Sequence, residues 1–227
     1  MANRVLLMRY SSIIFDLDGT LLDTVDDIGT AANTVLKELG YPSHPLPAYQ
    51  KFVGSGVAVL FQRAIPGDNP KQSEVEDCVA RFQQVYAACW NHASKPYDKI
   101  LELLDKLSIS QCKLAILSNK PDVFTKKCVS HFFSPYGFNP VFGQRPNVTR
   151  KPDPQAVLEI MEQHQSSDEQ TMFIGDSEID VQTAQNAGIF SVGVGWGYRG
   201  SEALLAQGVD LIVEHPSDLL AFLDGKI

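Results

Sequence analysis

The sequence contains no apolar run that approaches the about 20 residues needed to cross a bilayer, so no membrane-spanning helix is expected. The N-terminal apolar stretch from Val5 to Met8 is shorter than the apolar region of a signal peptide and has no small-residue cleavage site. These two absences predict a cytoplasmic protein.

Cysteine and histidine are too scattered to indicate a metal or redox site. The 4 cysteines show no C-x-x-C spacing, and the 5 histidines include no pair at i and i+4. Cys78 and Cys89 are expected in one helix, where a rise of about 1.5 Å per residue separates them by about 16 Å, too far for a disulfide. We therefore expect free thiols and structural or surface histidines.

Positive charge is also in short supply. The chain has 19 Lys and Arg against 27 Asp and Glu, a net charge of −8, which argues against nucleic acid or an anionic membrane as the main partner. With 227 residues, 44% hydrophobic and 20% charged, the chain can bury a real core. The expected state is a monomer or homodimer.

Short, continuous apolar runs alternate with helical patterns along most of the chain. Continuous runs indicate strands that are covered on both faces, and strand–helix alternation is typical of a doubly wound, Rossmann-like parallel sheet in an α/β fold. The runs lie at 12–15, 113–117, 171–174, 189–194 and 209–213. Helical spacing is clear at 98–107 and at 154–163, where Asp153 would cap the helix and Pro154 would be its first residue.

The alternation is interrupted between about Thr24 and Lys95. Apolar residues at helical spacing cover 25–39, 46–64 and 72–92, and no convincing strand separates them. The pattern predicts an all-helical cap at 23–96, inserted into a discontinuous core domain of 1–22 and 97–227.

Polar residues follow the predicted strands at the edge where an open parallel sheet binds its ligands. They are Asp16 and Asp18 after the first run, Ser118 and Asn119 after the second, and Asp176 and Ser177 after the third. A fourth polar cluster, 150–154, precedes a helix.

Asp16 and Asp18 are two residues apart, so in an extended backbone their side chains point the same way. Two carboxylates about 4 Å apart repel by roughly 4 kcal/mol at an effective dielectric of 20, and Asp176 and Asp180 would add to this. Oxygen ligands without histidine or cysteine favour Mg²⁺. Taken singly, an Asp-x-Asp is also a common loop end, and Asp176 or Ser177 also a common N-cap.

Lys151 precedes Pro152, which keeps it extended, and it could reach a phosphate and the acidic cluster. Ser118 and the Asn119 backbone could donate to phosphate oxygens. A solvated loop lysine and an ordinary Ser-Asn turn are the alternatives.

Taken together and in order, these motifs resemble those of the haloacid dehalogenase-like phosphohydrolase superfamily, and the helical insertion is similar to its cap domain. The motifs are 16–20 (DLDGT), Ser118-Asn119, Lys151-Pro152 and 175–180 (GDSEID). Within the superfamily, 52–56 (FVGSG) and 195–199 (GWGYR) look like segments of bacterial phosphoglycolate phosphatases.

The resemblance implies a role for each motif. Asp16 would be the nucleophile that forms an aspartyl-phosphate, and Asp18 the general acid and base. Mg²⁺ would be held by Asp16, the Asp18 backbone carbonyl and Asp176, with Asp180 supporting them. The phosphoryl oxygens would be bound by residues from three motifs: Thr20, Ser118, Asn119 and Lys151.

In the cap, the backbone N–H groups of Gly54, Ser55 and Gly56 could bind a small carboxylate, with charge from Lys51 or Arg63. A helix-flanking turn is the alternative for these residues. The resemblance implies a small phosphorylated metabolite as the partner, and phosphoglycolate is the first substrate expected. Other phosphomonoesters (sugar phosphates, nucleotides), a sugar phosphomutase reaction and a non-catalytic phosphate-ligand binder remain alternatives. A dehalogenase would not need Asp18, and 54–59 lacks the cap lysine of a phosphonoacetaldehyde hydrolase.

Overall fold

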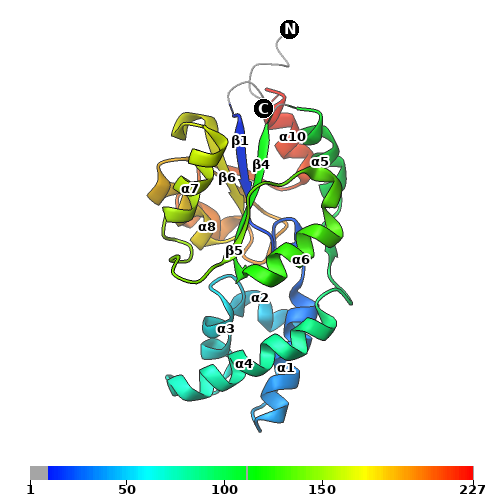
Figure 1. Ribbon diagram of the computed structural model, residues 1–227, viewed down its shortest axis with the longest axis vertical. Coiled ribbons are helices and arrows are strands. Elements are labelled where there is room, and N and C mark those ends of the chain that lie inside the picture. The colour runs from blue at the N-terminus through cyan, green and yellow to red at the C-terminus, as the bar shows by residue number, and fades with distance from the viewer. Residues whose placement is uncertain (1–9, 111, 227) are drawn as a thin grey trace.

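The computed structural model describes residues 10–110 and 112–226, and a six-stranded parallel sheet forms its centre (Figure 1). The strand order is β5-β4-β1-β6-β7-β8, so the chain builds outward from β1 in one direction and then in the other. This topology confirms the predicted doubly wound α/β fold. The strands are β1 (Ser12–Phe15), β4 (Lys113–Pro121), β5 (Val141–Gln144), β6 (Thr171–Gly175), β7 (Phe190–Val194) and β8 (Leu211–Val213). The stretch Val5 to Met8 lies outside the described residues.

Helices cover both faces of this sheet, which explains why the strands are apolar throughout. In β1, Ile13 and Phe15 face the cluster that includes α5 (Ile100–Ser108) and α10 (Pro216–Leu223). Ile14 faces α7 (Gln155–His164), and Phe173 of the neighbouring strand shares that cluster with α8 (Glu178–Ala187). Each such buried side chain contributes about 1.5–3 kcal/mol, so β1 is a rigid base for the loop that follows it.

Two further helices flank the sheet. Helix α6 (Asp122–Phe132) follows β4 and packs against β4 and β5, and α9 (Ser201–Ala206) lies against β7 and β8. The described residues also contain three short 3₁₀ turns: Leu46–Ala48, Ser134–Tyr136 and Asp168–Gln170.

Four helices form a separate layer at the lower end of Figure 1, with an apolar cluster of their own. They are α1 (Val25–Glu38), α2 (Tyr49–Phe52), α3 (Val57–Ala64) and α4 (Gln72–Cys89). The chain enters and leaves this helical layer through a two-stranded antiparallel ribbon, β2 (Leu22–Asp23) with β3 (Lys95–Pro96). The ribbon lies where the sequence predicted the two crossings between core and cap.

The helix predicted at 46–64 is interrupted. Gly54 and Gly56 have φ values of 109° and 91°, which a right-handed helix does not allow, so the segment divides into a 3₁₀ turn, α2 and α3. Helix α7 begins at Gln155, and Pro154 occupies the N-cap position that was predicted for Asp153.

The strand predicted at 113–117 continues to Pro121, so Ser118 and Asn119 lie within β4 and not in a turn after it. The reason is a neighbour that the sequence did not reveal: β5 pairs with β4 as far as Pro121 and Gln144, beyond an irregularity in the register. Strand β5 is short and half-buried, so it lacks a continuous apolar run.

Cys78, Cys89 and Cys128 are free thiols, as predicted. Within the described parts of the chain, no helix is both long and apolar enough to cross a membrane.

Candidate active site

Asp16 follows β1 directly, at the carboxyl end of the strand from which the strand order runs first to β4 and β5 and then to β6, β7 and β8. Its backbone N–H donates to Ile174 of β6 at 2.9 Å, and its Oδ1 accepts the Leu17 N–H at 2.7 Å. The side chain is almost fully buried, and this burial raises the pKa of Asp16 to about 7. The Lys151 ammonium lowers the pKa of Asp16, whereas Asp180 and Asp18 raise it.

The loop after Asp16 turns sharply at Gly19, where φ is 87°. A Cβ atom at this position would lie 2.4 Å from Oδ2 of Asp176, so the close approach of the loop to Asp176 requires glycine. Thr20 is fully buried next to it and donates its hydroxyl to Asp176 Oδ1 at 3.2 Å. In this structure Thr20 therefore orients a carboxylate.

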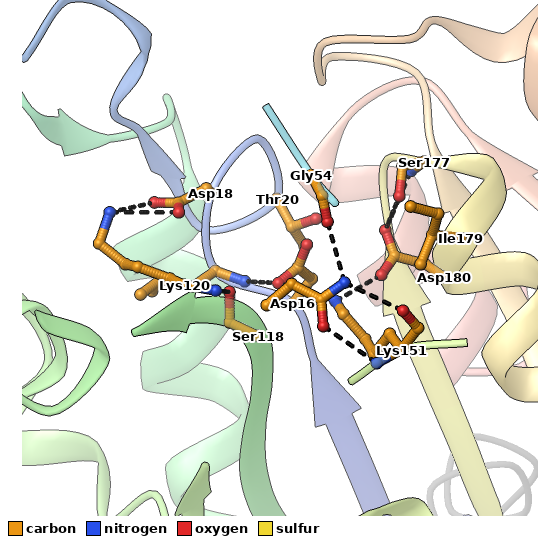
Figure 2. A network of polar contacts seen from close by, with 12 residues as sticks. Asp16, Asp18, Thr20, Gly54, Ser118, Lys120, Lys151, Ser177, Ile179 and Asp180 are labelled. Carbon is orange, nitrogen blue, oxygen red and sulfur yellow. Dashed lines mark hydrogen bonds and ion pairs between the residues drawn. The ribbon is translucent and has the colours of Figure 1, made fainter. Parts of the chain in front are cut away.

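The Lys151 ammonium lies between the carboxylates of Asp16 and Asp180 (Figure 2). Its Nζ is 3.0 Å from Asp16 Oδ1 and 2.7 Å from Asp180 Oδ1, with 2% of the side chain exposed. Burial lowers the pKa of Lys151, but Asp16 and Asp180 more than offset this, so the net shift is upward and the ammonium stays charged. Asp180 is itself held by the N–H and hydroxyl of Ser177, at 3.0 and 2.6 Å to Oδ2.

Three buried carboxylates gather here: Asp16, Asp176 and Asp180 each offer an oxygen within 4.8 Å of the others. Burial, reinforced by Asp180 and Asp16, raises the pKa of Asp176 well above its ordinary value. Lys151 alone does not balance these charges, so the cluster fits a divalent cation bound through hard oxygen donors. Both oxygens of Asp180 are already engaged, by Lys151 and by Ser177, which suits the predicted supporting role of this residue.

Asp18, predicted among the metal residues, turns its side chain the other way (Figure 2). Its carboxylate accepts hydrogen bonds from the Lys120 ammonium at 3.0 and 3.2 Å and from the Thr24 hydroxyl at 2.8 Å. The side chain of Asp18 is therefore not part of the acidic cluster, and only its backbone carbonyl could reach a metal held there.

Lys120 is a residue that the sequence analysis missed. It also donates to the Tyr86 hydroxyl at 2.8 Å. Burial lowers the pKa of Lys120, but Asp18 and Tyr86 outweigh it, and the net shift is upward, so Lys120 is a cation at neutral pH. Its position two residues after Ser118, on the same face of a strand, is the signal that could have found it.

The two predicted phosphate donors on β4, Ser118 and Asn119, are used differently. The Ser118 hydroxyl proton makes no hydrogen bond within the described residues. Its Oγ accepts the Lys120 N–H at 3.3 Å, and Ser118 lines the cavity next to Asp16 and Asp18. The Asn119 side chain instead joins two loops: it donates to the carbonyls of Gly54 and Lys151 at 3.0 and 3.2 Å and accepts the Lys151 N–H at 3.0 Å.

The cap loop 53–56 is held against the core through three successive carbonyl groups. Arg199 donates to Val53 at 2.8 Å, Asn119 to Gly54 at 3.0 Å and Arg150 to Ser55 at 2.8 Å. Neither Arg150 nor Arg199 was singled out as a contact of this loop from the sequence, because these contacts join segments far apart in the chain.

The structure separates the predicted cap residues. Gly54 and Gly56 line the cavity, whereas Ser55 does not, and its hydroxyl accepts from Arg63 at 3.2 Å. Arg63 also donates to the backbone carbonyl of Lys51, and neither residue lines the cavity. Of the lining residues, Lys120 carries the positive charge.

The segment 195–199 braces the Asp16 loop. The Trp196 indole N–H donates to the Thr20 carbonyl at 2.9 Å, and the Tyr198 N–H donates to Asp176 Oδ2 at 2.8 Å. The Tyr198 hydroxyl accepts the Thr24 N–H at 3.0 Å. The motif therefore holds the loop at Thr20 and at Thr24, on the far side of Asp18.

The cavity lies between the cap and the carboxyl ends of β1 and β4. Its polar residues are Asp16, Asp18, Ser118, Asn119 and Lys120, together with the Tyr86 hydroxyl. The remaining cap side chains on its wall are apolar: Ile28, Val53, Val57, Leu60 and Phe82. A small ligand bound here would have its charged end near Asp16 and its other end surrounded by the apolar cap side chains.

Known proteins are similar to this chain in sequence and in fold. The family model of haloacid dehalogenase-like hydrolases matches residues 13–194. A phosphoglycolate phosphatase of Vibrio parahaemolyticus is 34% identical, covering 92% of this chain and 93% of that protein. One from Pseudomonas putida is 33% identical, covering 94% of this chain and 78% of that protein.

Solved structures agree with the sequence comparison. The crystal structure of a protein from Lactobacillus delbrueckii subsp. bulgaricus superposes with a TM-score of 0.89 at 31% identity, covering 95% of this chain and 99% of that one. A haloacid dehalogenase-like hydrolase from Streptococcus pneumoniae gives a TM-score of 0.84 at 26% identity, covering 94% and 98% of the two chains. With its motifs at one edge of this sheet, the chain belongs to the haloacid dehalogenase-like hydrolase family.

Proposed function

We propose that this chain is a Mg²⁺-dependent phosphatase that hydrolyses small phosphomonoesters through an aspartyl-phosphate on Asp16, with 2-phosphoglycolate as the preferred substrate. The observation that carries the proposal is the position of Asp16: a buried carboxylate with a cation-binding cluster on one side and a second, separately held aspartate on the other. The phosphoglycolate phosphatases among the relatives support the substrate.

In the first half-reaction, an oxygen of Asp16 attacks phosphorus, the bond from phosphorus to the ester oxygen breaks, and Asp18 gives its proton to the departing alkoxide. In the second, Asp18 takes a proton from water as the water oxygen attacks the same phosphorus. Inorganic phosphate leaves and the Asp16 carboxylate is restored.

The other residues position and neutralise the phosphoryl group. The Lys151 ammonium and the Ser118 hydroxyl would bind its oxygens, where most of the catalysis of phosphoryl transfer arises. Mg²⁺, held by Asp16, Asp176 and the Asp18 carbonyl, would supply positive charge against the phosphoryl oxygens. Asp180 keeps Lys151 in place.

We further propose that residues 23–96 act as a cap domain that pivots on the β2–β3 ribbon. The loop 53–56 closes the cavity over the bound substrate when its three carbonyls meet Arg199, Asn119 and Arg150, and it then shields the first half-reaction from bulk water.

The test is phosphate release from 2-phosphoglycolate and from a panel of sugar phosphates and nucleotides, with Mg²⁺ and then with EDTA. We expect Mg²⁺-dependent turnover led by 2-phosphoglycolate, loss of turnover in Asp16→Asn, and unchanged turnover in the control Asp26→Asn, an exposed residue of α1. No turnover of any ester by the folded protein would contradict the proposal, and turnover led by another ester would contradict only the substrate.

A further inference from the structure

Lys120 links the core, the cap and the side of Asp18 that faces away from the acidic cluster. It lies on β4, Asp18 on the loop after β1, and Tyr86 on the cap helix α4. The Lys120 ammonium contacts both Asp18 oxygens and the Tyr86 hydroxyl. The exposed fractions are only 3% for the Lys120 side chain and 1% for Tyr86, so this is a dry corner that closes only when the cap meets the core.

One hydrogen-bond donor in this corner is not used by the protein, and it is not on Lys120. An ammonium has three protons, and Lys120 directs them to the two Asp18 oxygens and the Tyr86 hydroxyl. The Tyr86 hydroxyl accepts from Lys120, so its own proton is left over, and no acceptor in residues 10–110 and 112–226 takes it. A buried donor without a partner is costly, which indicates that an acceptor from outside the chain takes the Tyr86 proton, next to the Lys120 charge.

The Tyr86 hydroxyl and the Lys120 ammonium lie in the cavity that holds Asp16. Lys120 and Tyr86 line the same cavity as Asp16, Asp18 and Ser118. A phosphoryl group at Asp16 has its leaving oxygen next to Asp18, so the atoms beyond that oxygen come towards the partners of Asp18. An acceptor there would receive charge-assisted hydrogen bonds in a site without competing water.

We propose that Lys120 and Tyr86 form a subsite for a carboxylate on the leaving group, which makes the preferred substrate a short phosphorylated 2-hydroxy acid. The inference rests on the proposed phosphatase function and adds the residues that select the substrate. The apolar cap wall accepts a short methylene segment but offers no partners to the hydroxyls of a sugar.

The test compares kcat/KM for 2-phosphoglycolate with kcat/KM for 2-hydroxyethyl phosphate, in which a neutral hydroxymethyl group replaces the carboxylate. We expect the wild-type ratio to be about 100 or more. Tyr86→Phe should lower this ratio about tenfold and Lys120→Met about 100-fold, because each loses a hydrogen bond to a charged group.

Matched controls are available on the surface. Tyr136→Phe removes a hydroxyl that bonds to the exposed Asp105, and Lys126→Met removes a lysine with 59% of its side chain exposed. Both should leave the ratio unchanged within about threefold. If Lys120→Met fails to fold because Asp18 loses its partner, Tyr86→Phe, which keeps the ring, decides the result alone.

Hydrolysis of neither ester by the wild type would overturn the proposed function and this inference with it. Hydrolysis of both esters at a ratio near one, or a preference for 2-phosphoglycolate that persists in the Tyr86→Phe and Lys120→Met variants, would overturn the carboxylate subsite and leave the phosphatase function standing.

Discussion

Replacing Lys151 with methionine removes the ammonium between Asp16 and Asp180 while keeping most of the side-chain volume. The two carboxylates then remain buried without their shared partner, at 7% and 2% side-chain exposure. Breaking a buried ion pair from one side costs about 3–5 kcal/mol. For a chain of this size, 1 kcal/mol corresponds to about 2–4 °C in the unfolding midpoint, so we expect Lys151→Met to unfold roughly 6–20 °C lower.

The assay is thermal unfolding followed by circular dichroism, in EDTA and again with Mg²⁺. Mg²⁺ should recover part of the loss, because it returns positive charge to the cluster. The control is Lys126→Met, which breaks an exposed i,i+4 pair with Asp122 and should shift the midpoint by 2 °C at most. Phosphate release by Lys151→Met should fall by about 10²–10³, since one charge on the phosphoryl group is lost.

A double-mutant cycle isolates the pair. Adding Asp180→Asn to Lys151→Met removes one of the two charges left unpaired. The free energy of unfolding of the double variant should therefore exceed the value expected from the two single effects by on the order of 2 kcal/mol. Two results would refute the buried network as a source of both stability and charge compensation. One is an unfolding midpoint of Lys151→Met equal to that of the Lys126→Met control, and the other is strict additivity of the single effects.

Three further predictions follow from the site. The folded pKa of Asp16, about 7, is raised above its ordinary 3.8 chiefly by burial, so between about pH 4 and 7 the folded chain binds more protons than the unfolded one. In EDTA the midpoint should therefore fall as pH rises through that window and level off above it, and Asp16→Asn should flatten this slope; an equal slope in both proteins would contradict the assignment. Chelation should abolish phosphate release and added Mg²⁺ should restore it. Mg²⁺ should also raise the unfolding midpoint, which reports metal binding independently of activity. Full activity in EDTA would remove the metal from the mechanism. Arg150→Ala deletes the bond to the Ser55 carbonyl and should raise KM several-fold and speed proteolysis at 53–56, with a midpoint within about 2 °C of wild type. The surface variant Arg81→Ala is its control, and an unchanged KM would argue against this bond as a cap latch.

The sequence was sufficient for the features that depend on local pattern. Apolar runs predicted strands with both faces covered, and parallel strands necessarily bring their carboxyl ends to one edge. Asp16, Ser118, Lys151 and Asp176 were therefore expected near one another, and the structure places them there.

The errors and omissions have a physical cause. Strand β5 was missed because an edge strand of four residues, three of them half-buried, has no distinctive period. The predicted β4 was too short because its last residues depend on β5. The spacing from Ser118 could have placed Lys120 at the site, but not its role, because its partners lie 102 and 34 residues away in the chain and no spacing rule connects positions so far apart.

The sequence by itself determined the α/β architecture, the helical insertion and the edge of the sheet where chemistry would occur, because periodicity and strand-end residues are local properties. Only the tertiary structure decided how the aspartates divide their work. Asp18 turns to Lys120 and Tyr86 while Asp16, Asp176 and Asp180 gather around Lys151, and this division depends on which side chains the fold brings within hydrogen-bonding distance.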